Sequence, residues 1–145
     1  MKITILLTLL SFSVFSQEVK WTHNIDSAKI ESKETSKLIL LKFSGSDWCA
    51  NCKRLDKTLF ESDIFKSFAP NNLILVEADF PMKKKNRLSK EQQEHNDQLA
   101  EKFNKSGSFP LVIILNEKGE LLGKIKTPKN NIEDYIQQIK SFISN

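Results

Sequence analysis

The chain has 145 residues, a length typical of one domain, and 28% of them are charged, with a formal net charge of +4. Positive and negative residues are mixed along the chain, which favours a soluble protein and argues against a nucleic-acid partner. The densest basic cluster is Lys83 to Lys85 with Arg87. No aromatic residues are interleaved with it, so we interpret it as a solvated loop.

The N-terminus has the layout of a signal peptide. Lys2 gives a positive start, Ile3 to Phe15 is almost entirely apolar or small, and Ser16 precedes the expected cut. We therefore expect residues 1–16 to be a signal peptide and the protein to be periplasmic or extracellular. The apolar run is shorter than the roughly 18 residues of a spanning helix, so we expect no stable membrane insertion after cleavage. An uncleaved anchor or a core helix is the alternative interpretation.

Short apolar runs alternate with amphipathic segments along the rest of the chain, as in α/β domains. We separate an N-terminal extension, residues 17–36, from a domain of residues 37–145. The predicted strands are 38–43, 73–78, 111–115 and 120–125. The predicted helices are 26–35, 49–61, 62–70, 89–104 and 131–143. A hairpin turn at 116–119 makes the last two strands antiparallel. This order predicts a three-layer α/β/α domain with a mixed central sheet.

Local signals predict where several helices begin and end. Asp26 is a possible N-cap of the first helix, and Ser62 can cap the third. Ser89 with Gln92 forms a capping-box pair for the fourth helix. Pro70 and Asn71-Asn72 should end the third helix, because a proline disfavours helical backbone in the residue before it.

Both cysteines of the chain lie in one Cys-x-x-Cys, at the carboxyl end of the first strong strand. A bridge between Cys49 and Cys52 would close a very short loop and add little stability, so we interpret the pair as reactive rather than structural. Residues three apart on a helix share a face, which lets the sulfurs bond. At the helix start, unpaired N–H groups favour a Cys49 thiolate. We expect Cys49 to be the exposed nucleophile and Cys52 to face inward and resolve the mixed disulfide.

A metal site is the alternative use of these thiols. A structural zinc ion needs about four ligands, and the other candidate ligands, His23 and His95, lie far from the pair in the sequence. We therefore predict no zinc site. Copper(I) held by two thiolates, or a metal bridged between two chains, remains open. The alternative function is a binding module without catalytic turnover, whose cysteines are vestigial or hold copper for a partner.

The run Trp48-Cys49-x-x-Cys52-Lys53 after a buried strand, with Phe109-Pro110 before a later one, resembles the thioredoxin superfamily. Segments 43–49 and 78–81 are most similar to its exported bacterial thioredoxin-like members. The resemblance covers residues 37–142 and implies a thioredoxin fold and a thiol–disulfide oxidoreductase. We expect a reductase or isomerase rather than an oxidant, because the chain has no evident feature that destabilises its own disulfide. Its substrates would be exported protein disulfides and its electrons would come from a partner thiol. No flavin or other cofactor is implied.

The resemblance also implies roles for residues beside the cysteines. The Phe109–Pro110 bond is expected to be cis and, together with Trp48, to form a substrate-binding surface. A trans proline that opens an edge strand and an ordinary half-buried tryptophan are the alternatives.

Family members often carry a buried acid on the strand before the cysteines, and in this sequence Lys42 or Phe43 falls at that place. Lys42 could point toward Cys52, where its charge would favour the thiolate and tune the pKa of the thiol. It could instead point away and snorkel to the edge of the sheet. The sequence leaves both orientations open.

Overall fold

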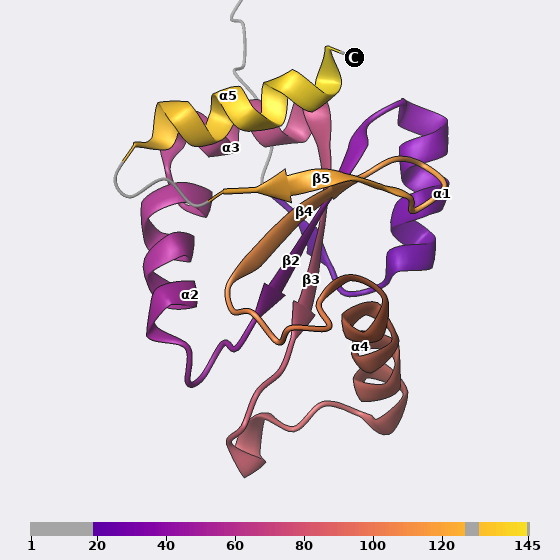
Figure 1. The fold of residues 1–145 in the computed structure, drawn as a ribbon, viewed down its shortest axis with the longest axis vertical. Coiled ribbons are helices and arrows are strands. Elements are labelled where there is room, and N and C mark those ends of the chain that lie inside the picture. The colour runs from indigo at the N-terminus through magenta and orange to yellow at the C-terminus, as the bar shows by residue number, and fades with distance from the viewer. Residues whose placement is uncertain (1–18, 127–130, 145) are drawn as a thin grey trace, which may run out of the picture.

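In the computed structural model, which describes residues 19–126 and 131–144, five strands form one mixed sheet with helices on both faces (Figure 1). The strands are β1 (Trp21–Thr22), β2 (Leu38–Ser44), β3 (Leu73–Asp79), β4 (Leu111–Leu115) and β5 (Leu121–Ile125). Their order in the sheet is β1-β3-β2-β4-β5. β1 and β2 pair parallel with β3, whereas β4 runs antiparallel to both β2 and β5. The predicted three-layer α/β/α domain with a mixed sheet is confirmed.

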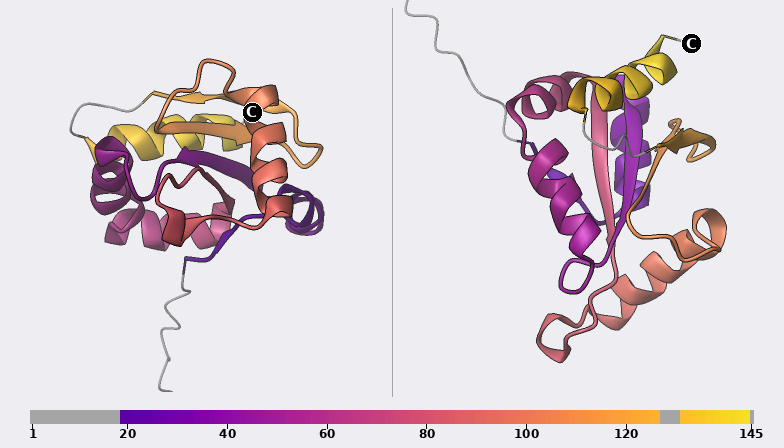
Figure 2. Two further views of the ribbon diagram at one scale, coloured as in Figure 1. Left: turned by 90° about the horizontal axis from the view of Figure 1, so that it is seen from below. Right: turned by 60° about the vertical axis from the view of Figure 1, so that its left-hand side comes forward.

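The helices cover the two faces of the sheet in two groups (Figure 2). They are α1 (Ile25–Thr35), α2 (Ala50–Leu55), the π-helix η1 (Asp56–Phe60), α3 (Asp63–Asn72), the 3₁₀-helix η2 (Lys84–Asn86), α4 (Lys90–Phe103) and α5 (Ile132–Ile143). Side chains of α2, η1, α3 and α5 pack on one face, and those of α1 and α4 pack on the other. The active-site strand β2 lies in the middle of the sheet, between β3 and β4.

The side chains of β2 divide the core between these two faces. Leu40 packs toward α2, α3 and α5, while Ile39, Leu41 and Phe43 pack toward α1 and α4. All four are fully buried. Because successive side chains of a strand point to opposite faces, a strand covered on both sides has to be apolar throughout. This explains the continuous apolar run and makes the one charged residue within it, Lys42, unusual.

The structure corrects the predicted N-cap of α1. Asn24, not Asp26, is the cap, and its Oδ1 accepts hydrogen bonds from the backbone N–H groups of Asp26 and Ser27. Asp26 instead lies in the first turn and pairs with Lys29 at 2.7 Å. An aspartate there still stabilises the helix through the macrodipole, which is why it resembles a cap in the sequence.

Helix α3 continues through Pro70 and ends at Asn72, the last of the three residues expected to end it. The missing N–H of Pro70 removes one intrahelical bond. The last turn is closed by two others: the side-chain amide of Asn72 donates to the carbonyl of Phe68, and the N–H of Leu73 donates to the carbonyl of Ala69.

The other predicted caps hold in part. Ser62 caps α3 by accepting from the N–H of Phe65, and Ser89 caps α4 by accepting from the N–H of Gln92. The return bond of the capping box is replaced, since the Gln92 side chain donates to the carbonyl of His23 and to Asn96.

The described part of the N-terminal extension, residues 19–36, belongs to the same sheet and core as the rest of the chain. Trp21 pairs with Leu75 of β3, and Ala28 of α1 is fully buried. The predicted signal peptide, residues 1–16, lies outside the described residues. Within residues 19–126 and 131–144, no helix has the length and apolar character needed to span a membrane.

Candidate active site

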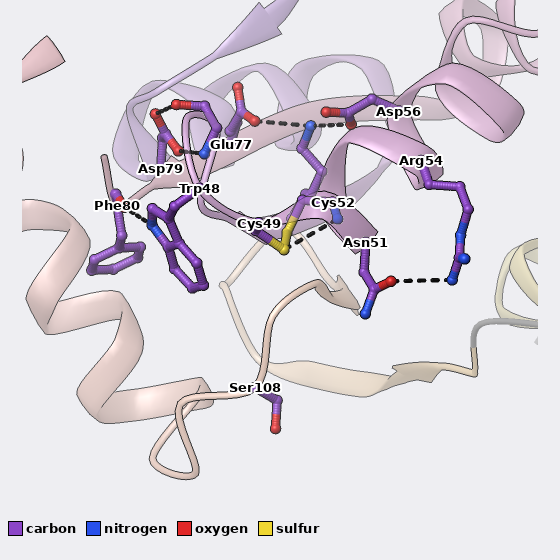
Figure 3. Close-up of a disulfide and its surroundings, with 12 residues drawn as sticks. Trp48, Cys49, Asn51, Cys52, Arg54, Asp56, Glu77, Asp79, Phe80 and Ser108 are labelled. Carbon is purple, nitrogen blue, oxygen red and sulfur yellow. Dashed lines mark hydrogen bonds and ion pairs between the residues drawn. A yellow bond between two sulfur atoms is a disulfide. The ribbon is translucent and has the colours of Figure 1, made fainter. Parts of the chain in front are cut away.

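Cys49 and Cys52 form a disulfide where β2 leads into α2 (Figure 3). The carbonyl of Gly45 closes the intervening turn by accepting from the N–H groups of Trp48 at 3.2 Å and Cys49 at 2.8 Å. Gly45 is required here by a close approach: a Cβ atom at this position would lie 2.3 Å from the Trp48 ring. The turn therefore presents the two cysteines on the first turn of a helix, as the sequence predicts.

Cys49 is itself the N-cap of α2. Its sulfur accepts a hydrogen bond from the N–H of Cys52 at 3.1 Å. In the reduced protein the same N–H would donate to a Cys49 thiolate, and a donor aimed at the charged form lowers the pKa of a thiol. This hydrogen bond is compatible with the predicted role of Cys49 as the nucleophile.

Both cysteines are buried in this disulfide state, with 6% of Cys49 and 1% of Cys52 exposed. The predicted inward position of Cys52 agrees with this burial, but the expected exposure of Cys49 does not hold here. The bond to Cys52 and the hydrogen bond to its N–H draw the Cys49 sulfur against the helix. Attack on a substrate disulfide requires the pair to be reduced first, because only a thiolate is a nucleophile.

Trp48 and Phe109, both predicted to contact substrate, meet beside the disulfide. Their rings pack edge to face with centroids 5.4 Å apart, and Phe109 packs similarly on Phe80 at 5.6 Å. The indole Nε1–H of Trp48 donates to the carbonyl of Phe80 at 2.7 Å, while 43% of the residue stays exposed. The Phe109–Pro110 bond is cis, as the resemblance implied.

Lys42 is buried beneath the helices and does not snorkel to the sheet edge. Its ammonium nitrogen lies 2.6 Å from Oδ1 of Asp56 and 2.8 Å from Oε1 of Glu77. The rings of Trp21 and Phe60 also flank the ammonium group, with centroids at 4.6 and 5.2 Å. Two carboxylates and two aromatic faces thus compensate the charge that burial in an apolar strand leaves unsolvated.

This ion triad, Lys42 with Asp56 and Glu77, is joined to the cysteines through α2. Asp56 follows Cys52 by four residues, so the two side chains project from neighbouring turns of one helix face (Figure 3). The helix changes at Asp56 from α to π geometry, and the N–H of Glu61 bonds to the Asp56 carbonyl. A charged group therefore lies one turn from the buried resolving cysteine.

Asp47 fastens the loop after β3 to the active-site turn. Its carboxylate accepts from the N–H groups of Met82 and Lys83, both at 2.9 Å, and from the Asn86 side chain at 2.8 Å. These hydrogen bonds, that of Met82 foremost, lower the pKa of Asp47 to about 2. Asp79 makes a second link, because its carboxylate accepts from the N–H and the hydroxyl of Ser46.

Sequence reasoning missed Asp47, Asp56, Glu77 and Asp79 as parts of this site. One pair had a usable signal: the predicted strands begin at residues 38 and 73, and parallel pairing from those starts aligns Lys42 with Glu77, as the observed register does. No sequence signal indicated the two loop contacts, Asp79 with Ser46 and Asp47 with Met82, because each joins residues more than 30 positions apart.

The arrangement offers little to a metal ion. Within residues 19–126 and 131–144, no three His, Cys, Asp or Glu side chains are grouped so as to hold one. His23 Nδ1 lies 3.0 Å from the carbonyl of Glu77, and Nε2 of His95 accepts the N–H of Ile25 at 3.2 Å. Both imidazole rings thus bind backbone groups.

The sequence matches the family described as Thioredoxin-like over residues 20–117, and the chain belongs to that family. The match begins inside the segment that we separated as an N-terminal extension. The shared fold and the cysteine pair at the start of α2 agree with this membership.

Among known proteins, the chain is 34% identical over 110 residues to the disulfide bond reductase DsbH of Chlamydia pneumoniae. That alignment covers 76% of this chain, which spans 64% of the length of the relative. A solved structure of a DsbH oxidoreductase superposes with a TM-score of 0.80 at 29% identity, covering 95% of this chain and 94% of the other. A disulphide isomerase from Xylella fastidiosa gives a TM-score of 0.60 at 19% identity over 83% of this chain and 88% of its own, which shows the fold alone.

Proposed function

We propose that this protein is a thiol–disulfide oxidoreductase that reduces disulfides of protein substrates through Cys49 and Cys52. The carrying observation is the position of the pair: a disulfide at a helix N-terminus, with the first sulfur accepting the N–H of Cys52. The similarity to a disulfide bond reductase supports the direction of the reaction. The chain's own residues supply both thiols of the cycle.

The cycle begins with the reduced pair. The Cys49 thiolate attacks one sulfur of the substrate disulfide, forming a mixed disulfide and expelling the other substrate sulfur as a thiolate. Cys52 loses its proton and attacks the Cys49 sulfur, which releases the second substrate thiolate and closes the Cys49–Cys52 bond. Two electrons pass from the protein to the substrate, whose thiolates take up the protons. A thiol electron donor then reduces the pair again.

The substrate would lie over the aromatic surface beside the disulfide. Trp48 supplies an exposed face next to Cys49, and Phe109 supports it from the loop that precedes β4. The bond before Pro110 turns that loop, and proline has no N–H of its own to bond.

Insulin reduction by dithiothreitol tests the proposal. The wild-type protein should accelerate precipitation of the insulin chains, and Cys49→Ser should remove the acceleration completely. Cys52→Ser is the matched variant: it keeps the nucleophile, so when it is mixed with insulin without dithiothreitol it should accumulate a mixed disulfide, which added dithiothreitol releases. A wild-type rate equal to that of dithiothreitol alone would reject the oxidoreductase and favour a binding module.

We further propose that the protein works outside the cytoplasm. The apolar N-terminal run with a basic start supports this, and so does a cysteine count that leaves no thiol beside the redox pair. Fusion of residues 1–16 to a reporter enzyme that is active only after export is the direct test. Reporter activity no higher than that of a fusion lacking residues 1–16 would reject the assignment.

A further inference from the structure

The loop that follows β3 is held beside the disulfide by two consecutive residues of the active-site turn. Asp47 binds the backbone of Met82 and Lys83 and the side chain of Asn86. Trp48, adjacent to Cys49, binds the carbonyl of Phe80. In Figures 1 and 2 the loop with η2 projects beyond the carboxyl ends of β2 and β3.

This loop carries a concentration of positive charge. The basic loop, which we define as residues 82–87, contains Lys83, Lys84, Lys85 and Arg87, all exposed. None of the four has a salt-bridge partner within 4.0 Å among the described residues. Lys83 interacts with the Asp47 carboxylate more weakly and helps to lower its pKa. The charges of the other three face solvent.

Two exposed apolar side chains, those of Met82 and Trp48, belong to residues that adjoin Asp47. Met82 is 74% exposed and Trp48 is 43% exposed. Asp47 accepts the backbone N–H of Met82 and immediately precedes Trp48 in the chain. An exposed methionine and tryptophan form an adaptable contact for a polypeptide. A polypeptide bound over Trp48 and Met82 would reach the loop that carries Lys84, Lys85 and Arg87.

We propose that the basic loop makes the enzyme prefer substrate disulfides flanked by acidic residues. The inference rests on the proposed function and specifies its substrate class. Complementary charge raises the rate of encounter and orients the partner, and the effect weakens as salt screens it. Continuity with the cysteine pair favours a polypeptide over a nucleic acid as the partner of these cations.

The test compares three disulfide-linked peptides that share one core sequence and carry acidic, neutral or basic flanks. Stopped-flow mixing with the reduced protein gives a second-order rate constant for each. We expect the acidic peptide to react about tenfold faster than the neutral one at ~0.01 M salt, where the Debye length is about 30 Å. The ratio should fall toward one at ~1 M salt, where that length is about 3 Å.

Two triple variants with the same change in net charge distinguish an effect of the basic loop from an effect of the net charge of the protein. Lys84→Glu/Lys85→Glu/Arg87→Glu should invert the preference toward the basic peptide. Lys33→Glu/Lys66→Glu/Lys118→Glu is the matched control, with exposed positions on α1, α3 and the β4–β5 turn, and it should retain most of the acidic preference. The salt series on the wild type tests the proposal without any variant.

Three results would overturn the inference. Equal rates for the three peptides at low salt would show that the loop selects nothing, and equal losses in both triple variants would assign the preference to net charge. Binding of a single-stranded oligonucleotide that only the loop variant loses, with peptide rates unchanged, would point to a nucleic-acid surface. Failure to reduce any of the peptides would instead contradict the proposed function.

Discussion

The charge of the ion triad beneath α2 should set how readily Cys52 loses its proton. With Lys42, Asp56 and Glu77 all ionised, the triad carries one net negative charge. Glu77→Gln makes it neutral and Lys42→Met makes it doubly negative. Because negative charge disfavours a thiolate, we expect the pKa of Cys52 in the reduced protein to fall in the first variant and to rise in the second.

The magnitude follows from Coulomb's law. A unit charge about 8 Å from the Cys52 sulfur contributes about 2 kcal/mol at an effective dielectric constant of about 20. That energy corresponds to a pKa change of about 1.5. Lys42→Met should also lower the free energy of unfolding by about 2–3 kcal/mol, because it leaves two partly buried carboxylates without their cation.

Thiolate absorbance against pH, measured in a Cys49→Ser background, reports Cys52 alone. Urea unfolding gives the free energy of each variant. The double variant Lys42→Met/Glu77→Gln is the matched control, since it restores one net negative charge without the lysine. Its Cys52 titration should return to the wild-type position. Identical titrations in all four proteins would refute the electrostatic role of the triad, whatever the stability measurements gave.

Three further predictions concern the turn around the cysteines. The pKa of Asp47 is about 2 in the folded protein, against 3.8 normally, so its stabilisation is present above pH ~4 and lost as the pH falls through 2. The stability difference between wild type and Asp47→Asn, from urea unfolding at a series of pH values, should shrink over that interval, and a constant difference would contradict it. Gly45→Ala places a Cβ atom 2.3 Å from the Trp48 ring, so unfolding should become about 1–3 kcal/mol easier and the Trp48 fluorescence should shift; an unchanged spectrum would argue against this packing. Ser44 has a buried hydroxyl without a hydrogen-bond partner among the described residues, so Ser44→Ala should stabilise the fold by up to about 1 kcal/mol in thermal unfolding, and a loss of stability would imply a hidden partner.

The elements of this fold were predictable where local pattern and tertiary environment agree. The apolar runs at 38–43, 73–78 and 111–115 correspond to β2, β3 and β4 to within one residue. Each run is buried on both faces of the sheet, so the continuous apolar pattern that this burial requires can be recognised in the local sequence. β1 has only two residues in a mostly polar stretch, too few to show a period, and it exists because β3 offers it an edge.

The contacts that organise the site were less predictable, because they depend on how distant segments meet. Pro70 stays inside α3 because Asn72 and Leu73 close the last turn after it, which no property of the proline itself reveals. Asp47 finds its partners in a loop that begins more than 30 residues later. Loop conformation decides such bonds, whereas helix and strand periodicity reports only which face is buried.

The same strand fixes both ends of the helix that carries the redox pair. β2 leads directly into the turn that ends at Cys49, and Lys42 within β2 binds Asp56, the first residue after α2. The start of the six-residue helix α2 is therefore joined to β2 through the intervening turn of the chain, and its end is held to β2 by the ion pair between Lys42 and Asp56. Changing Lys42 would alter both the charge near Cys52 and the position of the helix. For this reason the double variant is decisive: it restores the charge without restoring the tether, so a Cys52 pKa that returned to its wild-type value would assign the effect to charge.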